Sequence, residues 1–209
     1  MNGAWRRADA ILRGHPAPGS WLVVLACGLA YGGVMGAFGL RAGQMALSAI
    51  KVPLLLTATL GLSLPSYFVL NTLLGVRSDF AAAWRAVVAS QAGLTIILVS
   101  LAPITAFWYA SSADYRSAIL FNALMFAVAS AGAQGMLRRS YRPLIARDPK
   151  HRWLLRVWII LYAFVGIQMG WNLRPFIGTP DEPTRFFREG AWENAYVIVA
   201  RMAWDALAR

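Results

Sequence analysis

Few residues of this sequence are spaced so that their side chains could do chemistry together. The two histidines, His15 and His151, lie far apart in the chain, and neither has an evident partner for a buried site. Metal centres need several His, Cys or carboxylate ligands that converge, and a serine nucleophile needs a nearby base. The sequence has neither grouping, and no GxGxxG or Walker pattern. It therefore predicts a protein that is not an enzyme and has no metal or cofactor site; an enzyme would have to use polar residues such as Asp114, Arg174 and Glu189.

Amides are the polar side chains that recur inside the long apolar stretches of the chain. Asn71, Gln91 and Gln134 each stand about one helical turn from the same end of a predicted helix, whereas Asn122 and Gln168 stand toward the opposite end. Amides at matching depth can hydrogen-bond between helices, which contributes about 0.6 kcal/mol on average. The alternative is a polar path for a solute, but no acidic residue accompanies these amides.

The elements that would position these side chains are membrane-spanning helices. Only 14% of the 209 residues are charged, whereas soluble domains are about 25% charged. A hydrocarbon core about 30 Å thick needs about 20 helical residues, and no Asp or Glu falls inside the segments that qualify. The sequence predicts an all-α helical membrane bundle, one domain over residues 1–177, with five transmembrane helices at residues 21–40, 52–75, 87–109, 117–137 and 153–171.

Lysine and arginine residues predict which side of the membrane each helix end faces. With a cytoplasmic N-terminus, eleven of them flank the inner ends, and three, Arg41, Lys51 and Arg116, flank the outer ends. Such an excess in short loops marks the cytoplasmic side. An odd number of spans then places the C-terminus outside.

A basic stretch over residues 138–152 carries most of this inner charge. Its charge is sufficient to set the orientation of the chain in the membrane. It can also bind anionic lipid head groups, and each surface Lys or Arg adds about 1 kcal/mol to that binding. The formal net charge of +11 does not predict nucleic-acid binding, because the basic residues form short clusters between apolar segments. The stretch comprises Arg138, Arg139, Arg142, Arg147, Lys150 and Arg152.

The predicted outer tail covers residues 178–209 and begins with a turn at residues 178–183. Counted from Asn172, the chain holds five arginines and five acidic residues, so the tail casts no strong vote on orientation. Apolar side chains recur at helical spacing over residues 192–207, while Arg201 and Asp205 interrupt the apolar run. This pattern favours an amphipathic helix on the membrane surface. A sixth span is the alternative, and it would bury Glu193, Arg201 and Asp205 at high cost.

Three glycines recur every four residues in the first predicted span, at Gly28, Gly32 and Gly36. Small residues at this spacing let two helix backbones approach closely. The pattern favours packing against another helix of the same chain, with a dimer interface as the alternative.

The fifth predicted span ends in an outer motif of Trp171, Arg174 and Phe176. Pro175 disfavours the helical conformation of the residue before it, so Arg174 is expected at the helix end. There its guanidinium can reach toward the interface, or it can clamp the tail or a partner through a forked hydrogen bond. The acids of the tail, including Glu182 and Glu189, are candidate acceptors.

Two stretches resemble a group of uncharacterised bacterial membrane proteins labelled "actin-binding WH2 domain-containing". One is KVPLLLTATLGLSLPSYFVLNTLLGVRSD at residues 51–79; the other spans residues 162–189 and includes GWNLRPFIGTP at 170–180 and FFRE at 186–189. A looser resemblance is to Yip-family membrane proteins, which have five spans and a cytoplasmic N-terminus. The resemblance implies a multi-pass protein of the bacterial cytoplasmic (inner) membrane and no established activity.

These observations together predict a non-enzymatic membrane protein that acts as a scaffold or an accessory subunit of a larger membrane complex. Its expected partners are membrane lipids and other membrane protein subunits or further copies of itself. The alternative is a small oligomeric transporter or channel, for which the amides would line a path.

Overall fold

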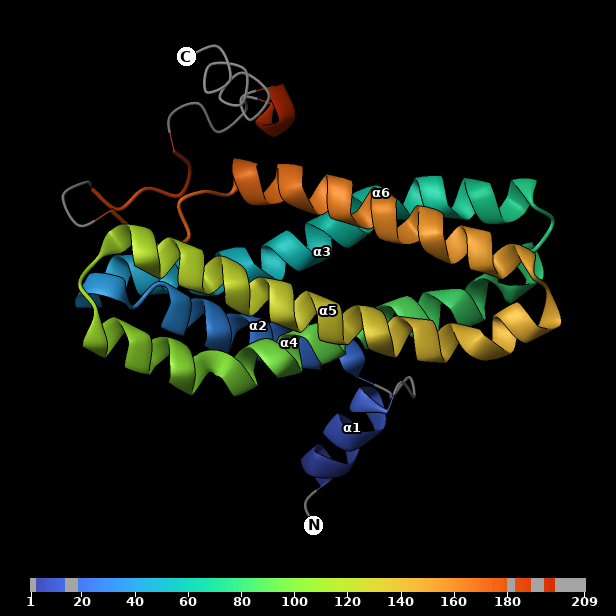
Figure 1. The fold of residues 1–209 in the computed structure, drawn as a ribbon, viewed down its shortest axis with the longest axis horizontal. Coiled ribbons are helices and arrows are strands. Elements are labelled where there is room, and N and C mark those ends of the chain that lie inside the picture. Colours follow the sequence, from blue (N-terminus) through green and yellow to red (C-terminus); the bar gives the residue numbers. More distant parts are fainter. Residues whose placement is uncertain (1–2, 14–18, 180–182, 189–193, 198–209) are drawn as a thin grey trace.

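The fold is that of a computed structural model, which describes residues 3–13, 19–179, 183–188 and 194–197. Within these ranges every regular element is a helix, and α2 to α6 run roughly along the long axis of the molecule (Figure 1). Four of the helices are long and apolar enough to cross a membrane. The predicted all-α, membrane-type bundle is confirmed, and its long helices are α3 (Ala42–Leu73), α4 (Phe80–Ser111), α5 (Tyr115–Arg147) and α6 (Lys150–Asn172).

The first predicted span is shorter in the structure than in the sequence analysis. Helix α2 (Ser20–Met35) has 16 residues, which reach about 24 Å at 1.5 Å per residue. The chain then passes through the short 3-10 helix η1 (Phe38–Leu40), where Gly39 has a φ of 73°. A positive φ is readily adopted by glycine, so the apolar run of residues 21–40 contains a turn that hydropathy does not register.

The other helices extend beyond the predicted spans. Helices α3 and α4 have 32 residues each, about 48 Å in length, which exceeds a hydrocarbon core of about 30 Å. Residues 42–51, predicted as a loop, are the first turns of α3, and most of the basic stretch 138–152 is the end of α5 and the start of α6. Hydropathy identifies only the apolar part of a helix, whereas the backbone hydrogen bonds continue into its polar turns.

Gly28 and Gly32 of α2, together with Gly36 directly after its last residue, pack against α3 of the same chain. Gly28 lies against Pro53, and Gly32 lies against the backbone of Ser48 and Ala49, where a Cβ atom would come within 2.8 Å of Ala49 Cα. A Cβ at Gly36 would lie 2.7 Å from the Gln44 carbonyl oxygen. The small residues thus permit the close backbone approach that their spacing predicts.

Two clusters of buried apolar side chains form the core. One joins α2, α3, α4 and α5 and includes Tyr31, Val52 and Leu98. The other lies toward the basic ends of the helices and joins α3, α4 and α5 to α6 through Leu60 and Trp158. Helix α6 contributes buried residues only to the second cluster.

Helix α1 and the described residues around Tyr196 pack on the outside of this bundle. The short helix α1 (Gly3–Leu12) projects sideways from it (Figure 1) and buries Ile11 completely in the first cluster. Near the other end, the aromatic ring of Tyr196 stacks on Phe164 of α6 with centroids 4.3 Å apart. The predicted surface helix over residues 192–207 lies mostly outside the described residues, of which 195–197 are helical.

Candidate functional site

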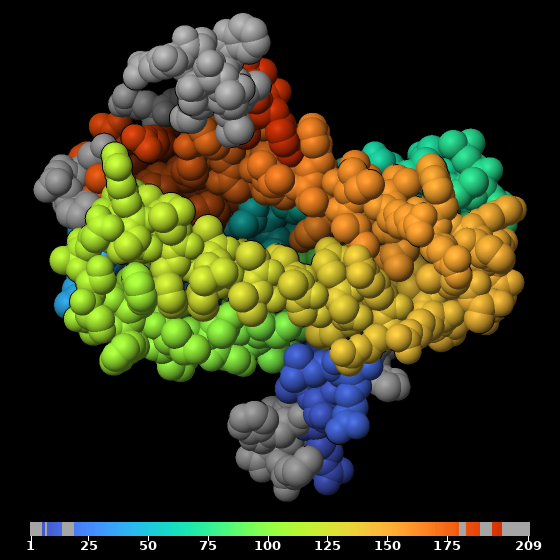
Figure 2. Space-filling model, viewed as in Figure 1, coloured from blue at the N-terminus to red at the C-terminus, as the bar shows by residue number. Residues whose placement is uncertain are grey.

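A lateral groove separates α5 from α6. All buried residues of α6 lie in its first nine positions, from His151 to Trp158, and none lies among residues 159–172. Figure 2 shows the resulting hollow between the two helices, with α3 visible at its floor. The groove therefore arises because α6 is fixed to the bundle at its basic end and diverges from α5 beyond Trp158.

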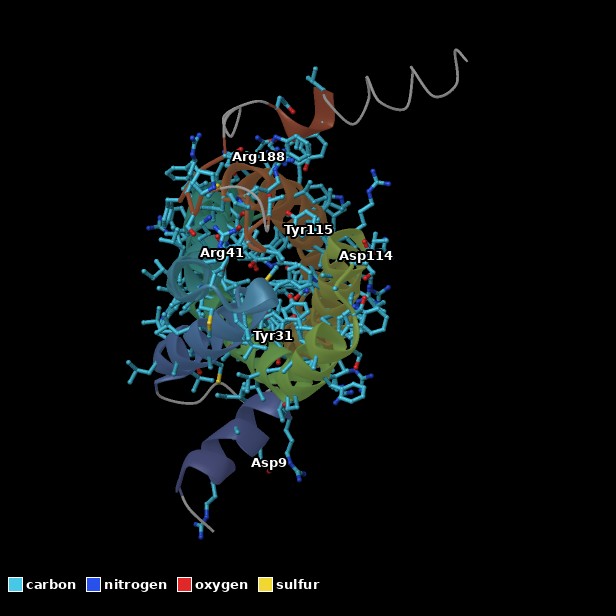
Figure 3. All side chains as sticks on the ribbon, turned by 90° about the vertical axis from the view of Figure 1, so that its left-hand side faces the viewer. Asp9, Tyr31, Arg41, Asp114, Tyr115 and Arg188 are labelled. Carbon is cyan, nitrogen blue, oxygen red and sulfur yellow. The ribbon has the colours of Figure 1, made fainter. Side chains whose placement is uncertain are left out.

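The groove contains a cavity of about 600 Å³ at the end opposite the basic stretch. Its walls are mainly apolar, with polar groups from Tyr115, Asn122, Arg174 and Arg188. Figure 3 looks onto this end of the bundle, where Tyr115 and Arg188 are labelled.

A second cavity of about 360 Å³ continues the groove toward the basic end. The two cavities share the walls formed by Leu55, Phe126 and Ile167, so the middle of the groove is apolar. The second cavity is lined in part by hydroxyl and amide side chains, namely Thr59, Ser90, Gln91, Ser130, Gln134 and Tyr162.

The strap, which we define as residues 174–179, closes one end of the groove by binding to α3. Gln44 Nε2 donates to the Phe176 carbonyl oxygen at 3.0 Å, and Ser48 Oγ donates to the same oxygen. Lys51 Nζ donates to the Pro175 carbonyl oxygen at 2.7 Å. Lys51 is fully buried, although the sequence analysis assigned it to an outer loop. The strap therefore satisfies polar groups of α3 that sequence reasoning did not single out.

The outer motif lies where the strap begins. Helix α6 ends at Asn172, and the Arg174 guanidinium lies 3.1 Å from the centroid of the Trp171 ring, while its Nε donates to the Trp171 carbonyl oxygen at 3.0 Å. Phe176 lines the first cavity. The clamp hypothesis also invoked Asp181, Glu182, Glu189 and Glu193, which lie outside the described residues.

Asn122 joins three helices at one wall of the groove. Its Oδ1 accepts from Tyr31 Oη of α2 at 3.3 Å, and its Nδ2 donates to Tyr109 Oη of α4 at 2.6 Å. The Tyr109 hydroxyl in turn donates to the Met35 carbonyl oxygen at 3.0 Å. Asn122 and Tyr31 are buried, so this group is an internal polar contact among α2, α4 and α5.

The three amides that the sequence analysis grouped by depth occupy two different places. Gln91 and Gln134 line the second cavity, and Gln91 Oε1 accepts from Tyr162 Oη at 2.8 Å. Asn71 is buried near the end of α3, where its Nδ2 donates to the Tyr67 carbonyl oxygen at 2.8 Å. Asn71 lies nearer a helix end because α3 stops at Leu73, whereas α4 and α5 continue beyond their predicted apolar segments at this end.

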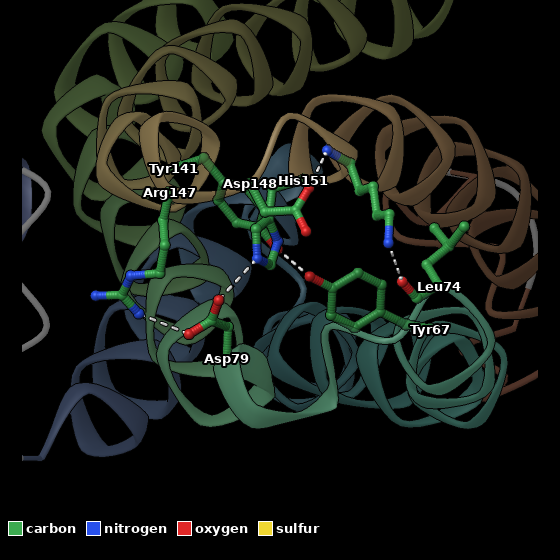
Figure 4. A network of polar contacts seen from close by, with 8 residues as sticks. Tyr67, Leu74, Asp79, Tyr141, Arg147, Asp148 and His151 are labelled. Atoms are coloured by element: carbon green, nitrogen blue, oxygen red, sulfur yellow. Dashed lines mark hydrogen bonds and ion pairs between the residues drawn. The ribbon is translucent and has the colours of Figure 1, made fainter.

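A carboxylate network joins the basic ends of the helices (Figure 4). Asp79 lies in the 3-10 helix η2 (Arg77–Asp79), where its carboxylate accepts from Arg147 at 2.7 Å and from His151 Nε2 at 3.1 Å. The hydrogen bond from His151 lowers the pKa of Asp79 below its ordinary value, and Arg147 adds to this effect. His151, for which the sequence showed no partner, is thus fully buried beside a carboxylate 72 residues away.

Two members of the basic stretch have structural contacts at this end. Arg147 pairs with Asp79, and Lys150 Nζ donates to the Leu74 carbonyl oxygen at 3.0 Å, beyond the end of α3. The side chains of Arg138, Arg139, Arg142 and Arg152 are exposed. These four cations remain placed where they can contact anionic head groups.

We expect Asp79→Asn to lower the melting temperature at neutral pH by a few degrees, because Arg147 and His151 lose a charged acceptor. A carboxyl whose folded-state pKa is depressed stabilises the fold above its ordinary pKa, and this contribution disappears as pH falls through the folded pKa. The difference between wild type and variant should therefore shrink in acid. Thermal unfolding in detergent across pH tests this expectation.

Asp9→Asn is the matched control for that measurement. Asp9 pairs with Arg13 at 2.9 Å, but both side chains are more than half exposed, and such surface pairs contribute little. Equal melting temperatures of Asp79→Asn and wild type at neutral pH would contradict a stabilising role for the network.

The described residues contain no group of three or more His, Cys, Asp or Glu side chains that could hold a metal ion. Comparison of the chain with models of protein families, with curated proteins and with solved structures finds no match.

Proposed function

We propose that this chain is a non-enzymatic integral membrane protein that serves as a scaffold or accessory subunit of a larger membrane complex. The observation that carries the proposal is the unburied half of α6, residues 159–172. Ile160 is 70% exposed and Phe164 56% exposed on this half. No side chain of this half is buried, so its exposed apolar side, which includes Ile160, can contact a helix of another membrane protein or of a second copy.

The polar side chains inside the helices support the same proposal. Asn122 binds Tyr31 and Tyr109, and Gln91 binds Tyr162, so these groups stabilise contacts within the chain. Polar groups used in this way hold a bundle together, and they are less available to replace the hydration shell of a passing solute.

A small oligomeric transporter or channel is the second candidate, and one observation favours it. The two cavities adjoin, and each has polar residues in its lining. Asn122 lines the first cavity and Gln134 lines the second. The shared apolar walls of Leu55, Phe126 and Ile167 interrupt this polar lining. Solute flux in proteoliposomes that is lost in Phe126→Trp and kept in Leu120→Trp would favour transport over the scaffold.

We place the chain in the bacterial cytoplasmic membrane, with the basic ends of α5 and α6 toward the cytoplasm and the C-terminus outside. The excess of Lys and Arg at these ends supports this orientation. In a Cys27→Ala background, cysteines at the exposed positions Ala113 and Ala146 should react with impermeant reagents added from opposite sides. Labelling of both positions from one side would contradict the orientation.

The scaffold proposal is tested by photo-crosslinking in native membranes followed by purification in mild detergent. A photoreactive residue at Ile160, on the exposed side of α6, should form a discrete adduct with a partner chain. The same residue at Leu62, which is 60% exposed on α3, is the control and should not. Equal labelling at both positions, with no chain retained on purification, would overturn the proposal.

A further inference from the structure

The two cavities of the groove form one trough whose chemistry changes along its length. The middle is apolar, through Leu55, Phe126 and Ile167, and the end at the strap carries two cations, Arg174 and Arg188. No Asp or Glu occurs among the described residues that line either cavity. An apolar trough with a positive end fits a molecule with a hydrocarbon part and an anionic head.

The volume of the trough is large enough for a hydrocarbon chain but too small for a transmembrane helix. The cavities measure about 600 and 360 Å³, within the range of small-molecule sites. A helix is about 10 Å across, so about 15 Å of its length would need on the order of 1,200 Å³. An acyl chain is much narrower and has no backbone polar groups to satisfy, so it fits the apolar middle where a helix does not.

The two arginines lie where they could bind the head group of a lipid. The Arg188 backbone N–H donates to the Arg174 carbonyl oxygen at 3.0 Å, which fixes the two residues side by side. The Arg188 side chain is exposed, and Trp171, an aromatic residue typical of the membrane interface, lies beside Arg174. Arginine side chains bind phosphate oxygens through paired, charge-assisted hydrogen bonds, so this pair of arginines suits the phosphate of a lipid.

We infer that the groove between α5 and α6 binds one anionic phospholipid, with an acyl chain along Leu55, Phe126 and Ile167 and the phosphate at Arg174 and Arg188. This lipid site goes beyond the proposed function, because it requires no partner protein. It is also separate from the exposed arginines at the basic ends of α5 and α6.

Gly170 offers a position from which a larger side chain can block the groove. Gly170 lines the first cavity, and a Cβ atom there would meet nothing within 4 Å, so the side chain of Gly170→Phe starts in open space and adds bulk to the groove. Gly61 has the same open surroundings on the exposed side of α3 and does not line either cavity. Gly61→Phe is therefore the matched control.

The purified chain is placed in nanodiscs of phosphatidylcholine that contain a minor fraction of phosphatidylglycerol, and retained lipids are counted by native mass spectrometry. We expect wild type and Gly61→Phe to retain one phosphatidylglycerol, and Gly170→Phe to lose it. Arg188→Glu should reduce the preference for phosphatidylglycerol about tenfold, whereas Arg185→Glu, outside the cavity lining, should not. Retention by Gly170→Phe, or equal retention of both lipids by wild type, would overturn the inference.

Crosslinking identifies the occupant directly. A photoreactive residue at Ala123, which lines the first cavity, should add the mass of one lipid, while the same residue at Leu120 of the same helix, outside the lining, should give mixed bulk lipids. A protein adduct at Ala123 would overturn the lipid site in favour of a partner helix or a second copy. The outcome is independent of the adduct at Ile160, so the lipid site and the scaffold can fail separately.

Discussion

Replacement of Gly32 by leucine is expected to abolish the packing of α2 on α3. A Cβ atom at Gly32 would come within 2.8 Å of Ala49 Cα and closer still to the Ser48 carbonyl oxygen. Both neighbours belong to the backbone of α3 and cannot rotate away. The two helices would have to separate, at a cost of about 3 kcal/mol, the upper end of the usual range for overpacking. The measurement is the melting temperature in mild detergent, followed by size-exclusion chromatography of the heated protein.

The adjacent glycine provides the control for this substitution. A Cβ atom at Gly33 would meet nothing within 4 Å, so Gly33→Leu places the same side chain on the same helix without a clash. We expect Gly33→Leu to melt near the wild-type temperature. If both variants melt near that temperature, α2 does not depend on close contact with α3, and the packing described for Gly32 is wrong.

Replacement of Asn122 by leucine is expected to have the second largest effect on stability. It removes the acceptor of Tyr31, the donor to Tyr109 and the bond from Nδ2 to the Ala118 carbonyl oxygen. Hydrogen bonds between side chains of membrane helices average about 0.6 kcal/mol, so the loss of the group should cost about 2 kcal/mol. Equilibrium unfolding in mixed micelles measures this difference.

A double-mutant cycle separates the hydrogen bonds from the change in shape. Asn122→Leu combined with Tyr31→Phe should destabilise by less than the sum of the single changes, because the bond between the two residues can be lost only once. Tyr115 is the control, since its hydroxyl donates to the Ile177 carbonyl oxygen rather than to Asn122. Coupling as large with Tyr115→Phe as with Tyr31→Phe would show that the cycle reports repacking.

The apolar segments, and the row of glycines through which α2 contacts another helix, were predictable from the sequence alone. No carboxylate falls within residues 52–75 or 87–109; α3 contains the first of these segments up to Leu73, and α4 contains all of the second. The spacing of Gly28, Gly32 and Gly36 predicted one face for close helix contact. Pro175 predicted an end of α6 near Arg174, and the helix ends at Asn172. Each of these properties depends on residues that are neighbours in the chain.

The candidate site was less predictable, because its contacts join distant residues. Lys51 binds a carbonyl oxygen 124 residues away, and His151 binds a carboxylate 72 residues away. A hydropathy scale places Lys51 in a loop because a lysine ammonium is normally solvated. In the structure the Pro175 carbonyl oxygen of the strap accepts its hydrogen bond, which allows Lys51 to be buried. Neither partner has a local signal that distinguishes it from other carbonyls or acids.

What the sequence by itself determined is therefore the set of apolar helices, the basic end of the bundle and the glycine face of α2. Only the tertiary structure decided that α6 diverges from α5 beyond Trp158 and leaves a groove. Local hydropathy is the same for a helix that faces lipid and for one that faces a cavity, since both surroundings are apolar. The direction of α6 instead follows from packing at its first nine residues and from the strap bound to Gln44, Ser48 and Lys51.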